Sequence, residues 1–267
     1  MSSLAEIPGE ARCKQVVHRL LTNTKTCTTC GGTIAWKRCR EYGWCKACRV
    51  KVRPKASTWF RGSKLSYRQL FVLLWCWQQR QSPRTACLVV GVSYTTVGRW
   101  YQRFRVLLPT ATAEQLSGIV EVDESFFGRE RYGHQTLVVG AIERDTRRLQ
   151  LQVIEDRAQD TLELFLTKYI ARSSLILTDA WAGYHDLEFY GYAHERCNHS
   201  NGHFGPTNNI ENMWGVMKRH LQRLYGCIPT RNLELTLKEW MARQNQPSWF
   251  ASPTNYLCFT LCSGLVD

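Results

Sequence analysis

Short apolar runs and amphipathic stretches follow one another along the second half of the chain. Residues 119–127 (IVEVDESFF), 137–142 and 149–154 have the composition of strands, and the polar residues 144–148 separate the last two as a hairpin turn. The pattern then predicts an amphipathic helix at 160–170, a short buried strand at 174–178, and helices at 181–190, at about 209–224 and at 232–244. Three antiparallel strands, a helix, a fourth strand and further helices predict a mixed sheet with helices on both faces.

The first half of the chain has a helical pattern. Residues 65–80 (LSYRQLFVLLWCWQQR) are apolar enough for a buried helix, and Ser82-Pro83 is a favourable helix start. Gly91 allows a sharp turn and Ser93 can cap the helix after it, which gives this segment the spacing of a helix-turn-helix. An ordinary three-helix packing unit without DNA contact is the alternative. In the helix-turn-helix interpretation, Tyr94, Thr95, Thr96 and Arg99 face a DNA groove, and Arg103 and Arg105 reach phosphates.

Charge is distributed unevenly between the two halves. The 267 residues hold 35 Lys+Arg and 22 Asp+Glu, a net charge of +13, but residues 1–116 carry 20 basic and 4 acidic side chains whereas the remainder carries 15 and 18. This asymmetry indicates a first half that binds a polyanion and a second half with another task. No apolar stretch approaches the ~20 residues of a membrane span, and the N-terminal residues lack an apolar signal core, so we expect a soluble, intracellular protein.

Four of the twelve cysteines form two CxxC pairs, Cys27 with Cys30 and Cys45 with Cys48. Each pair can present two thiolates in a tight turn, and two such turns complete a tetrahedral four-cysteine site, so we expect a structural Zn²⁺. Four unligated thiols at this spacing are the alternative. Cys39 lies between the pairs and is either a spare thiol or a replacement ligand.

The cysteine segment and its flank are strongly basic. Eleven Lys or Arg fall between residues 37 and 68 against one acid, Glu41, and Trp36, Trp44, Trp59 and Phe60 are interleaved with them. Basic residues with interleaved aromatics favour a DNA-facing module. The basic residues that we expect to contact DNA here are Lys51, Arg53, Lys55, Arg61 and Lys64.

Three acids lie at positions in the predicted sheet and helices that indicate a functional site. Asp123 lies within the first strand, Asp179 directly follows the fourth, and Glu211 lies in the first turn of the long helix. An unpaired interior carboxylate is costly, so an acid within a buried strand indicates a function. Three oxygen ligands suit Mg²⁺ or Mn²⁺, and two such ions ~4 Å apart can activate a water and stabilise the leaving oxygen of a phosphodiester. Lys218 and Arg219, two turns after Glu211, are placed to hold a phosphate.

Each of these acids also has a structural interpretation. Asp123 could be ion-paired within the fold, Asp179 could cap the helix that follows it, and Glu211 could form a capping box with Asn208. Any one of these explanations is plausible alone. All three acids at the ends or centres of suitable elements favour a shared site.

Other polar residues near these acids are candidates for a supporting role. Glu121 shares a strand face with Asp123 and could assist it, whereas Glu124 points to the opposite face. The histidines before the last acid are candidate bases, substrate contacts or buried hydrogen-bonded residues: His194, His203 and His199, the preferred one of the three.

Taken together, these segments resemble the DDE transposases of the Merlin superfamily and their bacterial insertion-sequence relatives. The matching stretches follow the family's order and cover most of the chain: STWFRGSKL (57–65), GVSYTTVGRWYQRFR (91–105), IVEVDESFFG (119–128), VVGAIERDT (138–146), LTDAWAGYHDLEFYGYAHERCNHS (177–200) and NNIENMWGVMKRHL (208–221). The resemblance implies a catalytic triad of Asp123, Asp179 and Glu211, which bind two Mg²⁺ (or Mn²⁺) ions, and zinc ligation by the two CxxC pairs.

The segment before the last acid both matches the family and departs from it. Asn198 and His199 fit the family's asparagine-histidine pair. Pro206 stands where the family pattern has a histidine, so a histidine contact from that position is not expected. Asn208 keeps the asparagine three residues before the acid.

The resemblance implies an α/β (α+β) chain in three domains: a zinc ribbon with a basic flank (1–60), a helix-turn-helix domain (61–112) and a ribonuclease-H-like DDE catalytic domain (113–267). The first two would recognise the terminal inverted repeats of a transposon. The third would cleave the ends by metal-dependent hydrolysis and join the freed 3′-hydroxyls to target DNA, without a covalent protein–DNA link. Because two ends are joined in one event, a homodimer or higher homo-oligomer on double-stranded DNA is expected, without a membrane partner. We expect it in the nucleus, or in the bacterial cytoplasm if the host is prokaryotic.

Two other classes of protein share parts of this pattern. A domesticated, non-catalytic zinc-ribbon and helix-turn-helix regulator would bind DNA without cutting it, but it would not need three metal-binding carboxylates. A plain ribonuclease-H-like nuclease would cut DNA without paired ends or 3′-hydroxyl joining.

Overall fold

The computed structural model describes residues 4–22, 26–27, 29–37, 42–53, 55, 58–109, 114–128, 135–179, 181–185, 187–197, 207–226 and 232–262. Its contacts separate into two compact units, residues 1–100 with 248–267, and residues 101–247. This division differs from the predicted one in two places. The predicted boundary at residue 112 falls within the second unit, and the C-terminal segment groups with the first unit instead of the catalytic domain.

The cysteine segment forms a small antiparallel sheet. Its strands, in the order β1-β2-β3, are β1 (Ile34–Trp36), β2 (Gly43–Cys45) and β3 (Lys51–Val52). Trp36 pairs with Gly43, and a Cβ at position 43 would lie 2.7 Å from the side chains of both Ile34 and Trp36. Glycine is therefore required for this register. Cys27, Ile34 and Cys45 are buried at the centre of this sheet.

Helices form most of the rest of the first unit. They are α1 (Glu10–Thr22), α2 (Tyr67–Gln78), α3 (Pro83–Val90), the beginning of α4 (Tyr94–Val106) and α8 (Pro253–Cys262), and short 3-10 helices lie at Leu4–Glu6 and Pro247–Phe250. The sequence pattern did not predict α1 and α8, which pack against each other and against α2. The carboxylate of Glu10 accepts the backbone N–H groups of Tyr67 and Arg68 at 3.0 and 2.7 Å, so α1 caps the start of α2.

The helix starts and the turn expected around residues 82–93 are confirmed. Ser82 accepts the backbone N–H of Thr85 at 3.1 Å, and Ser93 accepts that of Thr96 at 3.2 Å. Gly91 has a φ of 73°, in the left-handed region that glycine adopts without steric cost. These three residues therefore set the helix, turn and helix of this segment.

Phe60 is buried and Trp59 is half-buried in the first unit, so these two aromatic residues of the expected DNA-facing module pack within the unit. Phe60 is buried, and the Trp59 ring lies 6.0 Å from that of Trp100. The Trp59 indole N–H donates to Oγ1 of Thr260 at 3.2 Å. Burial of these large aromatic side chains stabilises the fold of the first unit.

The second unit is built on a five-stranded sheet in the order β6-β5-β4-β7-β8. The strands are β4 (Ile119–Phe127), β5 (Thr136–Glu143), β6 (Leu149–Ile154), β7 (Leu175–Asp179) and β8 (Ala193–Cys197). β4, β5 and β6 are antiparallel neighbours, whereas β7 is parallel to β4 and β8 is parallel to β7. Four of these strands match the prediction. The predicted helix at 181–190 is wrong, because a 3-10 helix (Ala182–Tyr184) and turns lead into the unpredicted strand β8.

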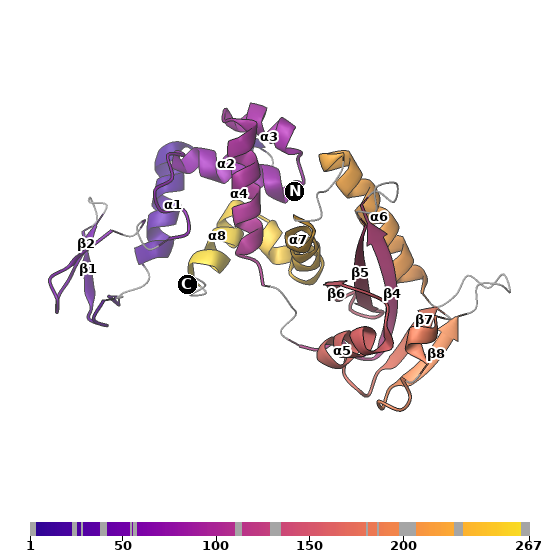
Figure 1. Cartoon of the computed structure of the whole chain (residues 1–267). Coiled ribbons are helices and arrows are strands. Elements are labelled where there is room, and N and C mark those ends of the chain that lie inside the picture. The colour runs from indigo at the N-terminus through magenta and orange to yellow at the C-terminus, as the bar shows by residue number, and fades with distance from the viewer. Residues whose placement is uncertain are drawn as a thin grey trace. The chain divides into compact units, whose positions relative to one another are not determined.

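Helices cover both faces of this sheet (Figure 1). One apolar cluster joins even-numbered residues of β4, such as Val120 and Val122, to α5 (Gln159–Tyr169). The other joins Phe127 of β4 to α6 (Asn208–Tyr225) and α7 (Leu233–Asn245). Alternate β4 residues therefore face α5 or α6. The strand order, the strand directions and the helices on both faces confirm the ribonuclease-H-like mixed α/β fold.

Candidate active site and metal centre

Asp123 lies near the middle of the central strand β4, on the face that α6 covers. It shares this side of the strand with Phe127, a member of the apolar cluster under α6. Burial, together with the negative charges of Glu124, Asp179 and Glu211, raises the pKa of Asp123 to about 7. The three predicted acids are thus close enough for their charges to act on one another.

Asp179 ends β7, the parallel neighbour of β4. The two strands pair through Glu121 and Leu177, and continuing that register brings Asp179 level with Asp123 on the same face. Oδ1 of Asp179 accepts the backbone N–H of Trp181 at 3.0 Å. Asp179 therefore stabilises the turn that follows it, as the structural interpretation expected, and also faces the first acid.

Glu211 lies in the exposed first turn of α6, whose N-cap is Thr207. The Thr207 hydroxyl donates to Oε1 of Glu211 at 2.8 Å, so Glu211 pairs with Thr207 and not with Asn208. Among the described residues, the group whose possible ligand atoms all lie within 4.8 Å of one another is the four cysteines, so the three carboxylates are spaced more widely.

Two basic residues follow on α6. The ammonium of Lys218 lies 5.3 Å from the centre of the Phe127 ring. Burial lowers the pKa of Lys218, and the negative charge of Asp123 offsets part of this shift. Lys218 therefore lies near the first acid, as expected. Arg219 lies along its own helix, because a Cβ on Gly215 would come within 3.2 Å of its guanidinium.

Glu124 points to the opposite face of β4, as the alternation predicted, and joins a buried polar group. Arg157 donates to Oε2 of Glu124, with its Nε at 2.8 Å, and the Tyr184 hydroxyl donates to Oε1. The Arg157 guanidinium also lies 4.1 Å from the centre of the Trp181 ring and 4.0 Å from Oδ2 of Asp179. Arg157 therefore connects the centre of β4 to the loop after Asp179.

The four CxxC sulfurs converge in the first unit. Sγ of Cys27 lies 3.8 Å from that of Cys48, and Sγ of Cys30 lies 3.4 Å from that of Cys45. A tetrahedral zinc ion with Zn–S bonds of about 2.3 Å separates its sulfurs by about 3.8 Å, so this set fits zinc. Backbone N–H groups, that of Thr29 first, lower the pKa of Cys27 to about 6, which favours the thiolate that binds metal.

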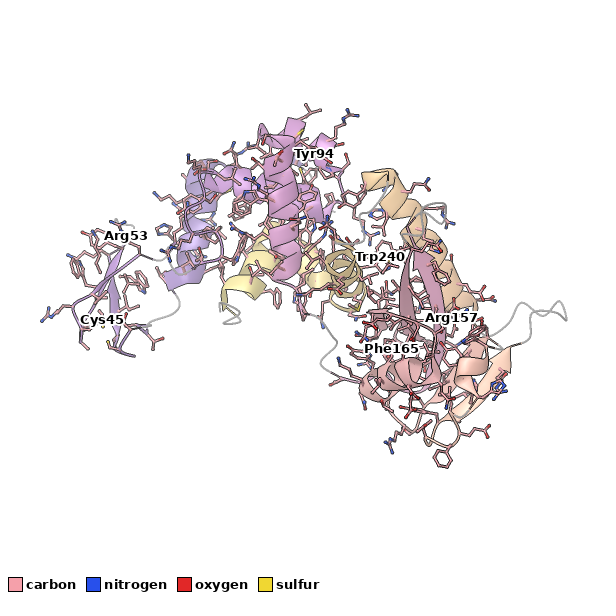
Figure 2. All side chains as sticks on the ribbon, viewed as in Figure 1. Cys45, Arg53, Tyr94, Arg157, Phe165 and Trp240 are labelled. Carbon is pink, nitrogen blue, oxygen red and sulfur yellow. The ribbon has the colours of Figure 1, made fainter. Side chains whose placement is uncertain are left out.

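The start of α4 presents most of the predicted groove-facing residues to solvent. Tyr94 is 60% exposed at the first position of the helix (Figure 2), and Thr95 and Arg99 are exposed as well. Arg103, which was expected to reach a phosphate, is exposed in the last turn of α4. Thr96 is half-buried, and its hydroxyl lies 2.8 Å from that of Ser93. An exposed polar and aromatic face on a second helix suits contact with a DNA groove.

The basic residues near the cysteines are also mostly exposed. Lys51, Arg53, Arg61 and Lys64 are exposed. Lys55 differs, because its half-buried ammonium donates to the carbonyl of Ser63 at 3.1 Å. Lys55 therefore closes its own loop, and the expectation that it contacts DNA is not supported.

Arg105 was expected to reach a phosphate, and this prediction is wrong. It is 6% exposed, its Nε donates to Glu239 of α7 at 2.6 Å, and its guanidinium also donates to the Tyr225 hydroxyl. Arg243 donates to the other oxygen of Glu239 at 2.8 Å. The helical period turns residue 105 toward α7, where its charge is compensated inside the fold.

Some predicted residues lie outside the described part of the chain: Cys39, Asn198, His199, His203 and Pro206. His194 is described, on β8. Its Nε2 lies 2.9 Å from the Thr178 hydroxyl, and burial lowers its pKa. His194 is thus a hydrogen-bonded residue of the sheet, as one of its interpretations held.

Sequence reasoning placed Glu121 on the strand face of Asp123 but missed its contact with the start of α6. Its carboxylate lies beneath the start of α6 and accepts the backbone N–H groups of Asn209 and Ile210. Thr207, the N-cap, makes no side-chain capping bond. The sequence held no signal for this contact, because Thr207 is itself a residue type that commonly caps helices.

Comparison with known proteins identifies the class of protein to which the chain belongs. A family model described as an ISXO2-like transposase domain matches residues 115–245. An uncharacterized transposase-like protein of Haemophilus influenzae is 35% identical over 97 residues, which cover 35% of this chain and 77% of that protein. The chain belongs to the DDE transposases of an insertion-sequence family.

Two integrase catalytic core domains are among the solved structures that match part of the chain. One is the catalytic core domain of BIV integrase, at 15% identity and a TM-score of 0.36, covering 49% of this chain and 84% of that one. The other is the HTLV-2 integrase catalytic core domain in complex with magnesium in its dimeric form, at 13% identity and a TM-score of 0.37, covering 54% and 97%.

Within the described residues, no helix combines the length and the apolar content needed to cross a membrane.

Proposed function

We propose that this chain cleaves DNA at the terminal inverted repeats of its element and joins the freed 3′-hydroxyls to target DNA. The observation that carries this proposal is Asp123, a partly buried carboxyl on the α6-facing side of β4 that is repelled by Asp179 and Glu211. Such a cluster of acids is unfavourable without a cation, and a set of carboxylate oxygens suits Mg²⁺ or Mn²⁺. Two such ions, when bound, activate the attacking oxygen and stabilise the leaving oxygen of a phosphodiester.

The chain's own residues have distinct roles in this proposal. Asp123, Asp179 and Glu211 hold the ions. Lys218 stands near the first acid and binds the phosphate of the strand being cut, and Arg219 assists it. His199, outside the described residues, stays a predicted contact to the substrate. The residues position the DNA and neutralise developing charge, and no covalent protein–DNA link forms.

The first unit recognises DNA in this proposal. The four cysteines hold a structural zinc that maintains the small basic sheet, where Lys51 and Arg53 are exposed, and the flank beyond it exposes Arg61 and Lys64. The exposed face of α4 enters a groove of the transposon end. Two ends are joined in one event, so the active form is a homodimer or a larger assembly on double-stranded DNA. Its site of action, the nucleus or a bacterial cytoplasm, stays a prediction.

A DNA assay with the full-length, zinc-loaded chain tests this function. The substrate is a labelled duplex that ends in the inverted repeat flanking the gene, with a target plasmid and Mg²⁺, and Asp123→Asn is the matched control. We expect Mg²⁺-dependent cleavage and joining from the natural chain and neither from the variant. Binding without cleavage would indicate a regulator, and cleavage without joining would indicate a plain nuclease. Equal cleavage by both proteins would contradict the assignment of Asp123.

A further inference from the structure

The carboxylate of Glu121 is buried beneath the first turn of α6, with 0% of the residue exposed. Its Oε2 accepts the backbone N–H groups of Asn209 and Ile210 at 2.8 and 3.1 Å. Its Oε1 accepts the side-chain amide of Asn209 at 2.6 Å and Nε of Arg144 at 2.8 Å. Both oxygens are thus occupied, and three of these four hydrogen bonds come from the start of α6.

Both sides of this contact, the acid on β4 and the residues at the start of α6, are close in sequence to members of the acid cluster. Glu121 precedes Asp123 by two residues on the same face of β4, and Asn209 and Ile210 directly precede Glu211. The first N–H groups of a helix have no partner within the helix and carry a partial positive charge. Thr207 makes no side-chain capping bond, so a carboxylate from the sheet takes the place of the cap.

A cap that comes from another element stabilises the helix and also fixes its position relative to that element. Each residue of an α-helix turns it by about 100° and advances it by about 1.5 Å. Hydrogen bonds from two consecutive N–H groups to one oxygen therefore fix both the rotation and the height of α6 on β4. A rotation by one residue would turn Glu211 away from Asp123.

We propose that Glu121 is a positioning residue, which sets the separation of Asp123 and Glu211 and thereby the affinity of the acid cluster for divalent ions. The inference rests on the proposed function, because it assumes that these acids bind the ions. Residues that orient metal ligands commonly change metal affinity by about 10- to 100-fold when they are replaced.

Glu121→Gln tests this role with little change of shape. The amide removes the charge and one of the two acceptor oxygens. Its partner Arg144 has a side chain that is 35% exposed, so water stabilises the remaining charge. In the full-length, zinc-loaded chain we expect about tenfold weaker Mn²⁺ binding by calorimetry. We also expect less hydrogen-exchange protection at the amides of Asn209 and Ile210, which lose part of their acceptor. DNA cleavage shifts to higher Mg²⁺ and recovers toward the natural rate at saturation.

Glu143→Gln is the matched control. Glu143 is another buried acid of the same sheet, on β5, and is 3% exposed. It accepts the backbone N–H of Ser117 at 2.8 Å and Nε of Arg148 at 2.9 Å, and these partners do not belong to α6. We expect this variant to lose stability while keeping the Mn²⁺ affinity and the Mg²⁺ dependence of the natural chain. Glu121→Asp, which keeps the charge that the helix N-terminus attracts, should restore part of the Mn²⁺ affinity.

The outcomes separate this inference from the proposed function. Unchanged Mn²⁺ affinity in Glu121→Gln, or an equal loss in Glu143→Gln, would overturn the positioning role while Mg²⁺-dependent cleavage by the natural chain still stood. A natural chain that does not cleave would overturn the proposed function instead. If Glu121→Gln fails to fold, Asn209→Ala removes the 2.6 Å bond alone, and Mn²⁺ affinity equal to that of the natural chain would then reject the inference.

Discussion

Replacing Asp123 by Asn is expected to stabilise the fold in the absence of Mg²⁺ and Mn²⁺ while it removes their binding. The pKa of Asp123 is about 7 in the folded chain against an ordinary value of 3.8, first because of burial and then because of neighbouring acids. A carboxyl whose pKa is raised by folding costs stability as the pH rises from about 4 to about 7, and the whole cost is present above that range. At about 1.4 kcal/mol for each pKa unit, its upper limit is about 4 kcal/mol.

Asparagine has nearly the same shape, and its carbonyl oxygen can still accept the backbone N–H of Glu124, which hydrogen-bonds to Asp123. We therefore expect Asp123→Asn to raise the free energy of unfolding by about 1–4 kcal/mol at pH 8, and by almost nothing at pH 4. Urea unfolding of the zinc-loaded chain at both pH values measures this difference. Asp145→Asn, at an exposed position, is the control and should change it by less than about 0.5 kcal/mol.

Added Mn²⁺ provides the second half of this test. It should stabilise the natural chain, because binding to the folded state alone raises the free energy of unfolding. It should not stabilise Asp123→Asn to the same extent. An asparagine variant that is no more stable at pH 8, or one that Mn²⁺ stabilises as much as the natural chain, would refute the reasoning.

Three further predictions concern other parts of the chain. Gly32→Ala should weaken zinc binding in a competitive zinc titration, because its Cβ would lie 3.1–3.2 Å from two of the cluster's sulfurs; Gly98→Ala, which meets nothing within 4 Å, should leave zinc affinity unchanged. Arg105→Gln should cost about 3–5 kcal/mol in urea unfolding because it breaks a buried ion pair. The exposed Arg103→Gln should keep that stability and lower DNA affinity in a binding titration, and equal stability losses would contradict this contrast. The hydrogen-bonded arginine beside Glu143 lowers the pKa of that acid to about 2 from 4.5, so its contribution to stability is present above about pH 5 and is lost as the pH falls toward 2. Glu143→Gln should flatten the acid-unfolding curve over this range, and an unchanged curve would contradict the prediction.

Local patterns in the sequence predicted the features that depend on neighbouring residues. Strand β4 follows from its alternation, and the starts of α3 and α4 follow from Ser82 and Ser93, whose hydroxyls accept N–H groups three residues away. The two CxxC pairs predicted a four-cysteine site because each turn depends on four consecutive residues. Asp123 was also recognisable, since a carboxyl within an apolar strand is unusual.

Contacts between distant segments decided the rest. Strand β8 was missed because its polar sequence forms a strand only where β7 offers a parallel edge. Arg105 has the composition of a surface contact, yet its partner Glu239 lies 134 residues further along the chain. Glu121 was expected to assist Asp123, but its hydrogen-bond partners come from α6, which begins 87 residues later. The sequence alone therefore determined which elements form and which residues can carry chemistry. Tertiary packing decided which charges are buried in pairs and which remain available at the site, because a charge is stabilised by whatever partners the fold brings to it.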